Sequence, residues 1–245
     1  MLDSGFLITE DNHRIEYTHN KNNSKKVIII AHGFYNSMDS ELLGRLRGKL
    51  SERYDVFMFD FRGHGKSSGL FTWAAREGKD LKAAMEYLDG KYGKKGVIAF
   101  SFAGSVSINL LSENTYDVDS LVCVSAPSDC SKIDYKWWKL DWENDIYYSL
   151  LTKNGRKGKG VRIGPFWLKK QKPISNVAKI KIPILYIHGD RDWVVEKWHS
   201  EALYGKTTSK KELITIKGGF HAEYLIRKHD SLFLEKTVEW FKNTL

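Results

Sequence analysis

Short apolar runs recur along the chain and constrain its fold more than any other feature of the sequence. They lack the polar alternation of a half-exposed strand, which is typical of strands covered by helices on both faces. The runs are Val27–Ala31, Val56–Phe59, Val97–Phe100, Leu121–Val124, Ile184–Ile187 and Leu213–Ile216. We predict a strand at each of these positions.

Helical patterns separate most of these runs. In residues 40–54, for example, the leucines at positions 42, 43, 46 and 50 fall on one stripe. Further helices are predicted over about 76–92, 197–204 and 230–244. Strands that alternate with helices predict an α/β fold with a mostly parallel sheet, helices on both faces and a ligand site beyond the carboxyl ends of the strands.

Two further segments near the N-terminus follow a different pattern. Leu7–Ile8 and Arg14–Thr18 flank a polar turn and favour a pair of antiparallel strands. Polar side chains also stand where three of the buried runs end, namely His32, Asp60 and Ser101. Because the carboxyl ends of parallel strands share one edge of a sheet, we expect these three side chains to converge there.

Composition narrows the class of protein. Hydrophobic residues make up 42% of the 245 residues, which is enough for a substantial core. The formal net charge of +9 is spread over scattered lysines, with one dense cluster at Lys153–Arg162. No nucleic-acid-binding motif accompanies the charge, so we interpret it as a solvated basic surface and expect no specific nucleic-acid partner.

Cysteine usage and hydropathy predict a cytoplasmic protein. Cys123 and Cys130 form neither a disulfide framework nor a metal-binding spacing, and we expect no metal. No apolar run is long enough to span a bilayer. The first residues lack the basic start and apolar middle of a signal peptide.

The alternation of strands and helices stops between residues 127 and 179. This segment is too aromatic for disorder and too long for an ordinary connection. We predict a cap folded over the rim of a core formed by residues 1–126 and 180–245. The aromatic side chains either form the small core of the cap or line a substrate pocket, and the candidate pocket residues are Trp138, Trp142 and Trp167.

Ser101 stands at the junction between a predicted strand and a predicted helix. A sharp turn at this place lifts a hydroxyl off the end of the sheet, as a nucleophile requires. A serine before a helix is also a good N-cap, so the turn by itself leaves both roles open. A serine hydroxyl further needs a neighbouring base to accept its proton.

Three candidate residues each follow a predicted strand, in the order Ser101, Asp192 and His221. The order nucleophile, acid, histidine is that of the α/β-hydrolase family, which the chain therefore resembles. The resemblance covers nearly the whole chain. It is carried by five segments, which are His32–Phe34, Asp60–Ser67, Ala99–Gly104, Ile187–Val195 and Gly218–His221. The family usually has glycine two residues before and after the serine, whereas this chain has Ala99 and Ala103.

The resemblance implies an eight-stranded sheet and assigns roles to individual residues. Ser101 would be the nucleophile, His221 the general base and Asp192 the acid that orients it. The backbone N–H groups of Phe34 and Phe102 would form the oxyanion hole.

Other side chains compete for these roles or take structural ones. Asp190 is a weaker candidate for the acid, and Asp129 would require a rearranged triad. His32, His64 and His188 are interpreted as residues that hold the loops of the rim.

The expected activity is hydrolysis of short to medium acyl or aryl esters through an acyl-serine intermediate. No cofactor is implied, and the expected partner is a small-molecule ester. Alternatives are a small serine peptidase or thioesterase of the same fold, or a binding protein without activity. The oligomeric state does not follow from the sequence.

Overall fold

The eight strands of this protein form one open sheet with the order β1-β2-β4-β3-β5-β6-β7-β8. The structure is a computed structural model that describes residues 1–245. The strands are β1 (Leu2–Ile8), β2 (Arg14–Asn20), β3 (Lys26–Ala31), β4 (Asp55–Phe59), β5 (Lys94–Phe100), β6 (Ser120–Val124), β7 (Ile184–Gly189) and β8 (Lys211–Ile216). β2 pairs antiparallel with β1 and β4, and all other neighbours are parallel. The predicted mostly parallel α/β sheet is confirmed.

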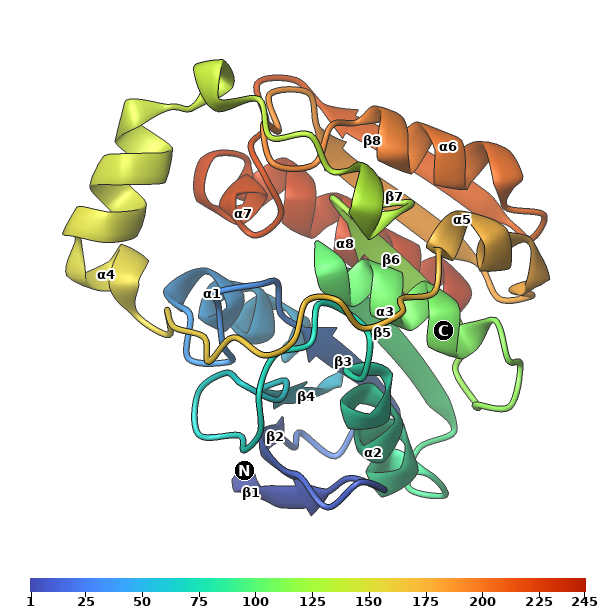
Figure 1. Cartoon of the computed structure of the whole chain (residues 1–245). Helices are drawn as coiled ribbons and strands as arrows, with labels where there is room; N and C mark the ends of the chain where they lie inside the picture. The colour runs from blue at the N-terminus through green and yellow to red at the C-terminus, as the bar shows by residue number, and fades with distance from the viewer.

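Helices cover both faces of the sheet (Figure 1). One face carries α1 (Glu41–Leu50), α7 (Tyr224–Lys228) and α8 (Asp230–Thr244), and the other carries α2 (Gly78–Leu88), α3 (Phe102–Leu111) and α6 (Trp198–Lys206). Helix α7 was not predicted, because its five residues are too few to show helical periodicity.

Strand β3 shows why the central strands are apolar throughout. Ile29 packs into the core beneath α2 and α3, while Ile28 and Ile30 pack into the core beneath α1 and α8. Each of these side chains is almost completely buried. Burial of one such side chain contributes about 1.5–3 kcal/mol, so both faces of the strand stabilise the sheet.

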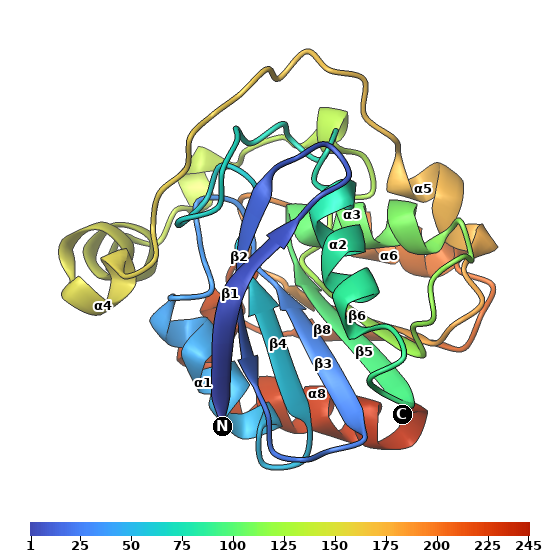
Figure 2. The same cartoon turned by 90° about the horizontal axis from the view of Figure 1, so that it is seen from below.

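Residues 127–179 depart from the regular alternation and lie beyond the carboxyl ends of the parallel strands (Figure 2). They contain short 3₁₀ turns, a wide helical segment at Trp142–Leu151, and the one-turn helices α4 (Lys153–Arg156) and α5 (Pro173–Asn176). In Figure 1 this segment arches away from the sheet before returning to it at α5. The two chain ends lie at the opposite edge of the molecule in Figure 2.

Arg62 anchors the loop that follows β4 next to this rim. Its guanidinium is fully buried and forms hydrogen bonds of 2.7–3.1 Å to both carboxylate oxygens of Asp80. It also contacts Asp11 at 2.9 and 3.0 Å. A forked donor between two carboxylates has little rotational freedom, so the loop is held in one position.

Candidate active site

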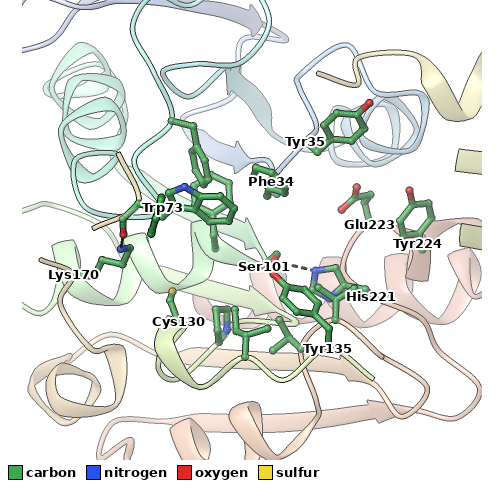
Figure 3. Close-up of a pocket in the computed structure, with 18 of the residues that line it drawn as sticks. Phe34, Tyr35, Trp73, Ser101, Cys130, Tyr135, Lys170, His221, Glu223 and Tyr224 are labelled. Carbon is green, nitrogen blue, oxygen red and sulfur yellow. Dashed lines mark hydrogen bonds between the residues drawn. The ribbon is translucent and has the colours of Figure 1, made fainter. Parts of the chain in front are cut away.

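Ser101 lies at the sharp turn between β5 and α3, in a strained backbone conformation. Its φ of 53° and ψ of −122° lie in a region that side-chain-bearing residues rarely adopt. The side chain makes no N-cap hydrogen bond to α3. Instead, Oγ lies 2.9 Å from Nε2 of His221 (Figure 3). The hydroxyl therefore faces a base rather than the helix.

Gly104 allows the start of α3 to pack closely against the segment that follows β6. A Cβ at position 104 would lie 2.5 Å from Cβ of Ala126, closer than two carbon atoms can approach. Ala99 and Ala103 are both fully buried. The strand-to-helix turn therefore accommodates a methyl group at both positions where the family usually has glycine.

His221 connects Ser101 to Asp192. Nδ1 of His221 lies 2.7 Å from Oδ2 of Asp192. The other carboxylate oxygen, Oδ1, accepts hydrogen bonds from the backbone N–H groups of Val194 and Val195 at 3.0 and 2.8 Å. Asp192 is therefore held at both oxygens, and Nδ1 of His221 carries the proton that it donates to Asp192.

Burial and charge act in opposite directions on this pair. Burial disfavours the ionised carboxylate, but the charge of His221 and hydrogen bonds from His188 and His221 hold the pKa of Asp192 well below its ordinary range. Burial also disfavours the imidazolium, yet the charge and hydrogen bond of Asp192 raise the pKa of His221, with a smaller contribution from Glu223. The pair is thus arranged to stabilise a proton on His221.

The two competing carboxylates lie elsewhere. Asp190 is exposed, and its Oδ1 accepts a hydrogen bond of 2.7 Å from the N–H of Gly218. Asp129 caps the short turn that follows it and pairs with Lys172 at 2.9 Å. Neither contacts His221.

The predicted oxyanion donors, Phe34 and Phe102, flank Ser101. Neither backbone N–H donates a hydrogen bond within the protein, so both are free to bind a developing negative charge. His32 holds the loop of Phe34, because its ring bonds to the carbonyl of Gly33 at 2.8 Å and to the N–H of Phe61 at 3.0 Å. Burial is the main reason why the pKa of His32 lies well below its ordinary value, and the ring is therefore neutral.

His64 and His188 also make contacts that hold loops. Nδ1 of His64 lies 3.1 Å from the carbonyl oxygen of Arg62. His188 bridges Oγ of Ser200 at 2.7 Å and the carbonyl oxygen of Val195 at 2.7 Å, which fixes the loop of Asp192.

A cavity of about 510 Å³ opens above Ser101 and His221, with mostly apolar walls. Its apolar lining comes from Phe34, Tyr35, Phe71, Trp73, Phe102, Pro127, Ile133, Tyr135, Phe166, Val194, Val195 and Tyr224. Figure 3 shows Trp73 and Lys170 on one side of the cavity, and Tyr35, Glu223 and Tyr224 on the other.

The three tryptophans expected in the pocket do not line it. Trp138, Trp142 and Trp167 are 76%, 69% and 74% exposed. The segment from 127 to 179 instead contributes Tyr135 and Phe166 to the cavity. The prediction was wrong because aromatic content alone does not determine which way a side chain points when the segment lacks a regular period.

Three charged residues that line the cavity, Lys159, Lys170 and Glu223, were not predicted. Lys159 belongs to the basic cluster that we interpreted as solvated, and Glu223 lies two positions after His221. The only sequence signal was the position of Lys159 between Gly158 and Gly160, two glycines with positive φ.

No group of His, Cys, Asp or Glu side chains has an arrangement that could hold a metal ion. No helix combines the length and apolar character needed to cross a bilayer.

Two family models match the chain. One, described as the alpha/beta hydrolase fold, matches residues 26–159, which is more than half of the chain. The other, described as serine aminopeptidase, matches residues 168–225. Together they span β3 to the loop that holds His221.

The chain is also similar to individual proteins, either in sequence or in structure. The chain is 26% identical over 228 residues to YfhR of Escherichia coli, covering 91% of this chain and 72% of that protein. The esterase Pf2001 of Pyrococcus furiosus superposes with a TM-score of 0.79 at 25% identity, covering 100% of this chain and 93% of the esterase. A bromoperoxidase from Bacillus anthracis shares the fold, with a TM-score of 0.75 at 21% identity over 98% of this chain and all of that one.

Proposed function

The chain belongs to the alpha/beta hydrolase fold family, and this membership supports a hydrolase activity. We propose that the protein cleaves carboxylic esters through an acyl-serine intermediate. In this proposal Ser101, His221 and Asp192 form the catalytic triad. The observation that carries it is the chain of two hydrogen bonds, 2.9 Å from Ser101 to His221 and 2.7 Å from His221 to Asp192. The likeness to an esterase at 25% identity favours esters over other acyl compounds.

The proposal assigns a residue to each step of the reaction. Nε2 of His221 accepts the proton of Ser101 as Oγ attacks the ester carbonyl. The negative oxygen of the tetrahedral intermediate binds the free N–H groups of Phe34 and Phe102. His221 then protonates the departing alcohol, and it activates the water that releases the acid. Asp192 stabilises the imidazolium throughout.

Residues 127–179 act as a cap in this proposal. They supply Ile133, Tyr135 and Phe166 to the lining of the cavity, so the cap forms part of its wall. Its apolar wall suits the acyl or aryl group of a small ester.

The direct test uses the purified protein with p-nitrophenyl butyrate and a fluorophosphonate probe. We expect steady hydrolysis of the ester and covalent labelling of one peptide, which mass spectrometry identifies as the peptide containing Ser101. Amino-acid p-nitroanilides and a butyryl thioester are assayed in parallel. Turnover of either of these compounds without turnover of esters would replace the proposal with the peptidase or thioesterase alternative, and absence of all turnover would favour a binding protein.

The rate is also expected to depend on the protonation of His221. Only the neutral imidazole accepts the Ser101 proton, so activity is lost as pH falls through the pKa of His221. Because Asp192 raises that pKa, the acid limb of kcat/KM should have its midpoint above about 6.5, the ordinary value for histidine. A profile of kcat/KM between pH 5 and 9 measures it, and a midpoint below the ordinary value would contradict the assigned pairing.

A further inference from the structure

One end of the cavity is polar, although most of its wall is apolar. Glu223 and Lys159 meet there, with an Oε1–Nζ distance of 3.3 Å, and their side chains are only 6% and 11% exposed. Asn36 donates a second hydrogen bond of 2.6 Å to the same oxygen, Oε1. We call these three residues the polar corner. They come from three separate segments, namely the loop after β3, the cap and the loop of His221.

The second carboxylate oxygen of Glu223 has no hydrogen-bond partner in the protein. A Cβ at position 33 would lie 3.5 Å from this Oε2 and 3.5 Å from Cβ of Ser101. Gly33 therefore leaves a small gap with the free oxygen on one side and the nucleophile on the other. Figure 3 shows the Glu223 carboxylate turned toward the cavity.

The backbone holds Glu223 in this direction. Ala222 adopts a φ of 50°, which reverses the chain directly after His221. The N–H of Ala222 donates to Oγ of Ser125 at 3.0 Å, which secures the reversal. A side chain directed by strained backbone next to the catalytic machinery is a candidate for function.

Lys159 offers donors at the same place. Its ammonium group has three N–H donors, and its one hydrogen bond within the protein goes to Glu223. The ring of Tyr224 lies beneath it, 5.2 Å from Nζ. Burial opposes the charge, but Glu223 raises the pKa of Lys159, so the ammonium stays protonated.

The charges decide what kind of group fits. A cation that approached Glu223 would be repelled by Lys159, and an anion that approached Lys159 would be repelled by Glu223. A neutral hydroxyl group satisfies both residues, because it donates to Oε2 and accepts from Nζ.

We infer that the polar corner binds a hydroxyl group close to the scissile ester, and that the substrates are monoesters of polyols or esters of hydroxy acids. This inference rests on the proposed ester hydrolysis. The apolar side of the cavity then holds the hydrocarbon part of the same molecule. One member of the basic cluster at Lys153–Arg162 thereby receives a role in substrate selection.

Three esters test the inference. Propyl butyrate carries no free hydroxyl, glycerol monobutyrate carries hydroxyls on the alcohol, and propyl 3-hydroxybutyrate carries one on the acid. We expect kcat/KM for one of the hydroxylated esters to exceed that for propyl butyrate by about 10- to 100-fold, the usual effect of a hydrogen bond to a charged group. The ester that gains identifies which part of the substrate reaches the corner.

Substitutions then assign the preference to the corner. The ratio to measure is kcat/KM for the preferred hydroxylated ester divided by kcat/KM for propyl butyrate. In Glu223→Gln, and separately in Lys159→Met, this ratio should fall by about tenfold or more. Glu235→Gln and Lys153→Met change exposed residues of the same types and serve as matched controls. A loss of structure would lower both rates together and leave the ratio intact, so the ratio separates recognition from folding.

The remaining outcomes overturn the inference. Equal kcat/KM values for all three esters would exclude hydroxyl recognition while ester hydrolysis itself stands. A preference that survives both substitutions would place the hydroxyl group elsewhere in the cavity. No hydrolysis of these esters or of p-nitrophenyl butyrate would overturn the proposed function together with the inference.

Discussion

Replacing Ser101 with alanine is expected to lower ester hydrolysis by about 10⁴–10⁶-fold and to abolish fluorophosphonate labelling. The substitution removes only Oγ, the atom that lies 2.9 Å from His221. Water is then the remaining nucleophile, and it lacks the fixed position that the turn gives the serine hydroxyl. The measurement is kcat/KM for p-nitrophenyl butyrate together with gel-based labelling.

Ser128→Ala is the matched control for this experiment. Ser128 is also buried and also hydrogen-bonded to a histidine, with 2.8 Å between its Oγ and Nδ1 of His199. It does not line the cavity, and no carboxylate bonds to the other nitrogen of His199. We expect the control to retain both labelling and turnover. If it loses them as Ser101→Ala does, or if Ser101→Ala keeps them, the nucleophile is assigned to the wrong serine.

Asp192→Asn is expected to have the second largest effect, a loss of about 10⁴-fold in kcat. The N–H groups of Val194 and Val195 donate to Oδ1 of Asp192, so an asparagine keeps its carbonyl oxygen there. Its NH₂ group must then face Nδ1 of His221 and donates to it. The imidazole is forced to carry its proton on Nε2, where it can no longer accept the proton of Ser101.

Asp190→Asn provides the comparison, because the sequence left it as a competing acid. Asp190 only accepts a hydrogen bond from the N–H of Gly218, and an asparagine oxygen accepts the same bond. We expect kcat to change by no more than a few fold. Circular dichroism and urea unfolding establish that both variants are folded. A large loss in Asp190→Asn with a small one in Asp192→Asn would exchange the two assignments.

The central strands could be predicted because their environment leaves a direct mark on the sequence. β3, β4 and β6 are covered by helices on both faces, so every residue after the first in each of these strands is apolar. β1 is different, since exposed and half-buried residues alternate along it. The start of β1 at Leu2 was not predicted, because the sequence of an edge strand with one solvent-exposed face is similar to that of a polar loop.

The candidate triad could be located for a related reason. A parallel α/β sheet gathers the ends of its strands at one edge, so residues directly after β5, β7 and β8 must lie near one another. The positions of Ser101, Asp192 and His221 after these strands were therefore enough to predict that the three residues lie close together. The choice between Asp192 and Asp190, in contrast, depended on a motif, because both aspartates follow the same strand.

The directions of the side chains in residues 127–179 and the contacts of the polar corner could not be predicted from the sequence. Trp138 and Phe166 are both aromatic, but only Phe166 lines the cavity. The direction of each side chain depends on the path of the backbone, which has no regular period in this segment. Asn36 and Glu223 are 187 positions apart, yet their side chains meet at 2.6 Å.

The sequence by itself determined the sheet, the helices that alternate with its strands, and the strand ends that carry Ser101, Asp192 and His221, since burial and strand direction act locally and repeat with a regular period. Only the tertiary structure decided which side chains line the cavity and which charges meet there. Loops without a period carry those side chains, and their directions follow from contacts with distant parts of the chain.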